Sequence, residues 1–179
     1  MRLVSDPAWI LTKNSVMGKV VELFAGLSGE WREMRWDLKG VDLARLEPKI
    51  SKGEQYKGLP WVMLDYPRVF GKEDVFAIRT MFWWGHCFSV TLHLKGEYMR
   101  AYMPVILGHR EELAAAGFMP QVGAEEWEHA VMPGAWDGLS AWRERGFGKL
   151  AVSVGLDRWN EAPEILTAKF KTLTQVLRF

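Results

Sequence analysis

The sequence predicts an α+β fold: one domain, residues 1–179, in which a mainly antiparallel sheet of about five strands carries helices largely on one face. Runs of β-branched and aromatic residues follow one another across tight turns, and strands joined in this way cannot be parallel. Apolar residues recur at helical spacing near both ends of the chain, outside the strand-rich region. The chain has no internal repeat and no long linker, which is typical of one domain at this length.

A helix near the N-terminus is predicted from its start signal and its apolar stripe. Ser5 and Asp6 are residues that cap helices, and Pro7 is tolerated in a first turn. One helix, or two joined near residues 13–15, should end by about Trp36. The polar, lysine-rich stretch 37–58 predicts a surface connection with a short helical turn at 42–46. The helical stripe comprises Val16, Val20, Leu23, Phe24, Leu27 and Trp31.

Three strands are predicted in close succession after this connection. Residues 59–66 are apolar and rich in strand-forming side chains, and Pro67 should stop them. Residues 74–84 and 86–95 are two long β-branched and aromatic runs separated by Gly85. This arrangement predicts a β-hairpin.

The C-terminal half is predicted to alternate helices with short strands. Residues 97–116 predict a helix with a break at Pro104, because an interior proline removes a backbone donor, and with a stop at Gly117. Residues 118–122 predict an edge strand, 124–132 a helical turn, 133–146 an irregular loop and 147–156 a half-buried strand. A last helix, capped by Asp157 or Asn160, is predicted from an apolar stripe of Ala162, Ile165, Leu166, Phe170, Leu173, Val176 and Leu177.

The length of the hairpin loop decides which residues share a face of the sheet. A two-residue loop mixes polar and apolar residues on both faces, whereas a three-residue loop around Gly85 separates them. Burial of apolar area, at about 25 cal/mol per Å², favours the separated version. We therefore expect Arg79, Thr91 and His93 together on the face away from the main core. The apolar face then carries Phe76, Ile78, Thr80, Phe82, Phe88, Val90, Leu92 and Leu94.

Composition and charge limit the partners that the chain can have. Lys and Arg number 23 against 22 Asp and Glu, and this balance gives no basic footprint for nucleic acid. The apolar runs are too short for a membrane span, and the N-terminus does not resemble a signal peptide. One cysteine is compatible with a reducing compartment, so we expect a soluble cytoplasmic protein. The 10 tryptophans exceed what one core needs and predict a homodimer.

Neither a metal nor another cofactor is predicted. Glu125 and His129 are four residues apart and would share a helical face, but two ligands do not make a metal site, and a solvated acidic turn is the simpler interpretation. Cys87 follows His86 directly, so on a strand the two point to opposite faces. Cys87 is therefore interpreted as a small hydrophobic residue.

The predicted ligand-binding residues lie on the polar face and at the strand ends. Arg79, Thr91 and His93 form the first group, and His93 is the group on that face that titrates near neutral pH. Asp65 and Arg68 follow the first predicted strand, where they form either a turn clasp or half of a polar site.

Aromatic residues at the hairpin tip form a second candidate group. Trp83 and Trp84 either make a platform for a sugar, a nucleobase or a protein, or cover the core or a dimer seam. Either role is compatible with the excess of tryptophan.

Two functions remain open at this point. The first is a non-catalytic ligand- or protein-binding module that self-associates. The second is a small cofactor-independent enzyme that uses acid-base residues on the polar face of the sheet, among them His93, Arg79 and Asp65. The absence of nucleotide-binding, nucleophile-elbow and metalloprotease motifs favours the first.

Overall fold

A six-stranded antiparallel sheet is the centre of the fold, in the order β1-β2-β3-β4-β6-β5. The computed structural model describes residues 2–34, 36–38 and 41–178. The α+β class with an antiparallel sheet is confirmed, and the sheet has six strands rather than about five. The strands are β1 (Lys49–Tyr56), β2 (Leu59–Phe70), β3 (Val75–Trp83), β4 (Cys87–Lys95), β5 (Met119–Pro120) and β6 (Phe147–Gly155).

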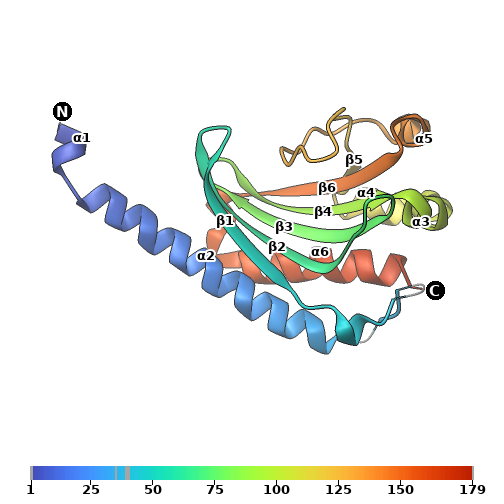
Figure 1. Ribbon diagram of the computed structural model, residues 1–179, viewed down its shortest axis with the longest axis horizontal. Helices are drawn as coiled ribbons and strands as arrows, with labels where there is room; N and C mark the ends of the chain where they lie inside the picture. The colour runs from blue at the N-terminus through green and yellow to red at the C-terminus, as the bar shows by residue number, and fades with distance from the viewer. Residues whose placement is uncertain (1, 35, 39–40, 179) are drawn as a thin grey trace.

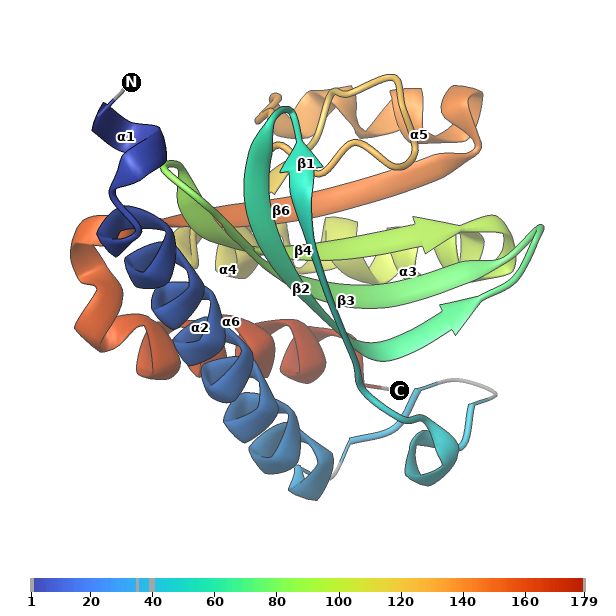
Figure 2. The same ribbon diagram turned by 60° about the vertical axis from the view of Figure 1, so that its left-hand side comes forward.

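Helices cover one face of this sheet. Figures 1 and 2 place α2 and α6 on the same side, opposite the irregular segment that follows β5. The helices are α1 (Arg2–Ser5), α2 (Ala8–Glu33), α3 (Gly96–Gly108), α4 (Arg110–Ala115), α5 (Ser140–Arg145) and α6 (Ala162–Val176), with 3-10 turns η1 (Leu43–Arg45), η2 (Trp136–Leu139) and η3 (Leu156–Glu161).

The main core lies between these helices and the apolar face of the sheet. On α2 the spacing of Val20, Phe24 and Trp31 turns their side chains to the same side, and all three are fully buried. The Trp31 ring stacks on Phe170 of α6, with ring centroids 4.1 Å apart. The Trp31 indole donates a hydrogen bond to Thr167, so the buried ring is both packed and satisfied.

The hairpin register agrees with the prediction of an odd-length loop. Trp83 pairs with Cys87 across β3 and β4, which leaves a three-residue loop with Gly85 at a left-handed φ of 72° in its middle. Arg79 lies opposite Thr91, and Ala77 opposite His93. The apolar face therefore points at the helices, and the polar face points away from them.

Two predictions about the first half of the sheet are wrong. The stretch 37–58 is not only a surface connection, because residues 49–56 form β1 at the edge of the sheet; residues 39 and 40 lie outside the described part. Pro67 does not stop β2, which continues to Phe70. The pairing with β3 shifts between Asp65 and Arg68, and such an irregularity lets a strand carry a proline.

Helix boundaries differ from the prediction at several places. α2 itself agrees with the prediction, since it is one helix that ends at Glu33, before Trp36. α3 runs through Pro104 and breaks at His109 instead, because buried residues on both sides of the proline hold the helix on the sheet. Residues 124–132 contain no helix, whereas 133–146 contain η2 and α5. Neither Asp157 nor Asn160 caps α6, which η3 precedes directly.

Candidate functional site

The polar face of the sheet is covered by residues 121–135, which we call the cover loop. Its base is closed by backbone hydrogen bonds from Val122 to Met132, 3.1 Å, and from Gly134 to Pro120, 2.7 Å. None of the buried hydrophobic side chains of the core belongs to the cover loop. Polar contacts with the sheet, together with the Trp127 ring packed on Phe70, hold it in place.

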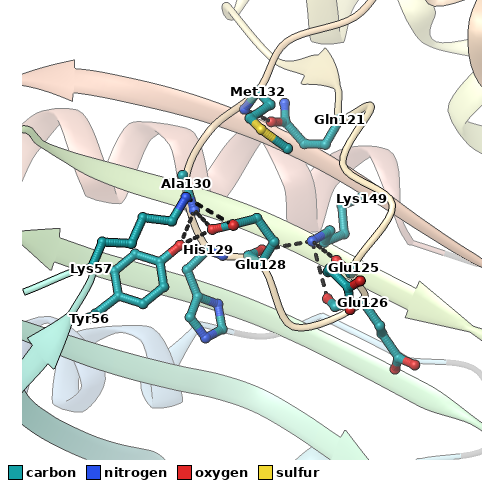
Figure 3. A network of polar contacts seen from close by, with 10 residues as sticks. All are labelled: Tyr56, Lys57, Gln121, Glu125, Glu126, Glu128, His129, Ala130, Met132 and Lys149. Carbon is teal, nitrogen blue, oxygen red and sulfur yellow. Dashed lines mark hydrogen bonds and ion pairs between the residues drawn. The ribbon is translucent and has the colours of Figure 1, made fainter.

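Lys149 holds the centre of the cover loop (Figure 3). It lies on β6 directly opposite His93, and its Nζ donates to the backbone carbonyls of Glu125, Glu126 and Glu128 at 3.3, 3.1 and 2.7 Å. Burial lowers the pKa of Lys149 from 10.5 to about 8, although the Glu128 carboxylate opposes this shift. The ammonium form therefore persists at neutral pH, with its donors directed at the loop.

A second set of contacts joins the loop to the turn between β1 and β2. The Tyr56 hydroxyl donates to the Glu128 carboxylate and accepts hydrogen bonds from the backbone of His129, 3.0 Å, and Ala130, 2.8 Å. Lys57 pairs with the other oxygen of Glu128 at 2.9 Å. Glu128 is thus held by a phenol and an ammonium from the sheet side.

Arg79 is bound by an acid within the sheet. Its Nε lies 2.7 Å from Oδ1 of Asp65, the residue opposite it on β2. The guanidinium also lies 5.5 Å from the ring centroids of Phe70 and of Trp127, a residue of the cover loop. Its charge is consequently neutralised by Asp65, and the guanidinium lies beside the two rings, which contact each other.

His93 is the group without such partners. Its side chain is fully buried, and neither ring nitrogen has a hydrogen-bond partner among the described residues. Its Nε2 lies 3.4 Å from Oε1 of Glu126, an oxygen that also lacks a hydrogen-bond partner among the described residues. The other carboxylate oxygen of Glu126 pairs with Lys95 at 3.0 Å. The edge of Trp127 covers the ring, with centroids 5.2 Å apart.

Both histidines of the site are neutral at ordinary pH. Burial, reinforced by the charges of Arg79 and Lys149, lowers the pKa of His93 from 6.5 to about 3. The same causes lower the pKa of His129 to about 4. A neutral imidazole carries one donor and one acceptor, so His93 brings both kinds of unpaired atom to the site.

These side chains surround a small, partly enclosed cavity between the sheet and the cover loop. About 10 Å³ is open to the centre of a water-sized sphere, which corresponds to room for one water molecule. The wall combines hydroxyls, methionines, charged groups and imidazoles: Met63, Arg79, Met81, Ser89, Thr91, His93, Glu126, Glu128, His129 and Lys149.

The structure brings part of the predicted set together. Arg79, Thr91 and His93 line this one cavity, and Asp65 joins them by its contact with Arg79. Arg68 does not form a clasp with Asp65; it lies opposite Ala77, and its Nε has no partner in the described part of the chain.

The tryptophans of the hairpin tip do not form one platform. Trp83 stacks on His86, 3.6 Å between centroids, and contacts Tyr56, whereas Trp84 contacts Phe82 of the core. Neither lines the cavity.

Sequence reasoning missed Lys149 as a member of the site, and it interpreted Glu126 and Glu128, with Glu125 and His129, as a solvated acidic turn. Lys149 was recognisable as a polar residue of an alternating strand, but its place beside His93 depends on the pairing of β4 with β6, which sequence does not specify. His129 and Glu125 were considered as metal ligands. Among the described residues, no group of three or more His, Cys, Asp or Glu side chains is placed to hold a metal ion.

Comparisons with known proteins do not add to this description: no protein family, curated protein or solved structure matches the chain. Within the described residues, no helix combines the length and the apolar character needed to cross a membrane.

Proposed function

We propose that the protein is a non-catalytic binding module whose small-molecule ligand occupies the cavity beneath the cover loop. The observation that carries this proposal is His93, a fully buried side chain whose two ring nitrogens have no described partner and which lines a cavity. Buried polar groups in folded proteins are nearly always hydrogen-bonded, so unpaired ones beside a cavity indicate a missing partner. Binding sites typically combine an apolar wall with a few such groups.

Ligand entry requires that the cover loop lift. The cavity has room for one water molecule, and any larger ligand needs more room. A loop that adds no hydrophobic side chain to the fully buried core and rests largely on polar contacts opens at low free-energy cost. The arrangement thus supports a closed resting form and an open form that admits the ligand.

Nuclear magnetic resonance of ¹⁵N-histidine-labelled protein tests the proposal, because the chain has only 4 histidines. The probes are glycerol, acetamide, N,N-dimethylacetamide, acetate and inorganic phosphate, each added to the full chain. At least one probe should shift the His93 ring signals in a saturable way, while His109, exposed at the end of α3, stays constant. If no probe shifts His93, the cavity holds a buried water only and the proposal is wrong.

The alternative, a small cofactor-independent enzyme, draws on the same residues. It is favoured by the gathering of shifted pKa values at His93, His129 and Lys149. Against it, Asp65 neutralises Arg79 and three carbonyls engage Lys149, which leaves few groups free for proton transfer. Turnover of a bound probe that is lost in His93→Gln would favour the enzyme.

Self-association and a cytoplasmic location are further parts of the proposal. Support for a homodimer comes from Val4, Trp9 and Leu11, large exposed apolar residues on α1 and on the end of α2 that extends beyond the sheet in Figure 1. Light scattering at tens of micromolar should give twice the chain mass of 20.6 kDa, and the chain mass itself would reject the dimer. The free Cys87 supports a reducing compartment, and the near-neutral charge argues against a nucleic-acid partner.

A further inference from the structure

We infer that the ligand of this cavity is a small neutral molecule that presents hydroxyl or amide N–H donors. The inference rests on the binding function proposed above and specifies its ligand. It follows from which atoms of the wall are already paired and which are not.

The cations around the cavity are already engaged. Arg79 pairs with Asp65 at 2.7 Å, and the three carbonyl contacts of Lys149 use the donors of its ammonium. Lys95 pairs with Glu126 at 3.0 Å, and Lys57 with Glu128 at 2.9 Å. An anionic ligand would have to displace one of these partners.

Carboxylates on the wall oppose an anion further. Glu126 and Glu128 both line the cavity, and a second negative charge brought near them in a closed site is repelled. A cationic ligand meets the opposite problem, since Arg79 and Lys149 also line the wall. A neutral ligand avoids both penalties.

The unpaired atoms of the cavity wall favour a ligand that donates hydrogen bonds. The fully buried wall atoms without a described partner are Oε1 of Glu126 and the two ring nitrogens of His93. A carboxylate oxygen only accepts, and a neutral imidazole supplies one acceptor and one donor, so among these three atoms acceptors outnumber donors by two to one in either tautomer.

The short distance between His93 and Glu126 also favours a ligand that donates hydrogen bonds. Nε2 and Oε1 are 3.4 Å apart, and with the proton on Nδ1 both are acceptors that face each other. A ligand O–H or N–H within hydrogen-bond distance of both atoms satisfies at least one of them, and a separate acceptor group of the ligand is needed for the Nδ1 proton, which points away from this gap. A hydroxyl carries both functions on one oxygen, and a primary amide carries the donors on its nitrogen and the acceptor on its carbonyl oxygen.

The rest of the wall fits a ligand with a small apolar part. Met63 and Met81 lie opposite each other on β2 and β3, and Ser89 is the neighbour of Met81 on β4. Methionine side chains adapt their shape to the group that they contact. The ligand's carbon atoms would rest on these methionines, with its donors directed toward His93 and Glu126.

Titration of the labelled full-length protein with matched probes tests the ligand class. Acetamide carries two N–H donors, N,N-dimethylacetamide carries none, and acetate has the shape of acetamide with a negative charge. We expect acetamide and glycerol to shift the His93 signals saturably, with a dissociation constant at least about tenfold below that of acetate and of N,N-dimethylacetamide. Phosphate should leave the His93 signals unchanged.

A pair of variants identifies the acceptor. Glu126→Gln replaces the unpaired carboxylate by an amide and should reduce the preference for acetamide over acetate to near unity. Glu125→Gln is the matched control, because its exposed side chain takes no part in the wall and only its backbone carbonyl contacts Lys149. The preference should persist in this control.

The outcomes separate the ligand class from the binding function. A saturable shift with acetate or phosphate and none with acetamide or glycerol overturns the neutral-donor class and leaves the binding function standing. Equal responses to acetamide and N,N-dimethylacetamide also overturn it, because donors would then play no part. Absence of any response to every probe overturns the binding function as well.

Discussion

Asp65 and Arg79 face each other across β2 and β3 and form a largely buried ion pair, with 2.7 Å between Nε and Oδ1. Asp65 is the last residue of β2 in regular register before the pairing shifts. The pair therefore fixes the strand alignment at the point where it could slip. It also holds the guanidinium against the contacting rings of Phe70 and Trp127, so that Arg79 supports the cover loop instead of offering a free charge to a ligand.

Asp65→Asn should destabilise the protein markedly. The amide keeps one acceptor but removes the negative charge, and a mostly buried guanidinium without its counter-charge is unfavourable. We expect a loss of about 2–4 kcal/mol in the free energy of unfolding, measured by urea denaturation. Glu161→Gln, in an exposed pair with Arg158, is the control and should change little. Equal effects of the two substitutions would contradict the buried role of Asp65.

Lys149→Met should release the cover loop while the sheet stays folded. Three backbone carbonyls of the loop lose their shared donor. Hydrogen exchange of amides in residues 122–132 should become roughly tenfold faster, which corresponds to about 1.4 kcal/mol of local stability. Lys169→Met, which removes a 2.6 Å contact with the Ala116 carbonyl, should leave that exchange unchanged. A loop that stays protected in Lys149→Met would show that other contacts hold it.

Phe170→Ala should be among the most destabilising substitutions in the core. The ring is fully buried and stacks on Trp31, with a 5° angle between the ring planes. Truncation leaves a cavity between α2 and α6, and we expect a cost of about 3–5 kcal/mol in thermal or chemical unfolding. Leu107→Ala, at a position 45 % exposed on α3, is the control for removal of apolar volume. A cost for Phe170→Ala near that of the control would mean that α6 is peripheral.

The parts of the fold that could be predicted from the sequence are those where the burial of apolar side chains favours one arrangement over the others. The register of β3 and β4 followed from the requirement that apolar side chains share one face, and this placed Arg79, Thr91 and His93 correctly. β1 was missed because a polar, lysine-containing edge strand lacks that signal and owes its place to pairing with β2.

Local rules failed where tertiary contacts outweigh them. Pro67 and Pro104 were both interpreted as breaks, yet β2 and α3 continue through them because the flanking residues are held by the core. The contacts of the cover loop were harder to predict, since Lys149 and Glu126 come close to His93 only through strand pairing and loop closure. The site residues on β3 and β4 could therefore be predicted from the sequence pattern, whereas Lys149 and the residues of the cover loop could not.

His93 should make the protein less stable as the pH falls. Its pKa is about 3 in the folded protein and near 6.5 when the chain is unfolded, so between these values the unfolded state binds a proton that the folded state does not. Stability is therefore lost as the pH falls below about 6.5, and the contribution of His93 at about pH 4.5 should be on the order of 3 kcal/mol. Urea denaturation at a series of pH values measures it.

A pair of variants separates His93 from the carboxylates that also titrate in this range. His93→Gln removes the imidazole, so its unfolding free energy should fall less steeply between about pH 6.5 and pH 4.5 than that of the unchanged chain. Thr91→Val alters the same cavity wall without removing a titrating group and should keep the steep dependence. The groups facing His93, namely Arg79, Lys149, Lys95, His129 and Glu126, are present in both variants, so their titration cancels in the comparison. Parallel curves for the unchanged chain and His93→Gln would show that His93 is not held neutral by its surroundings.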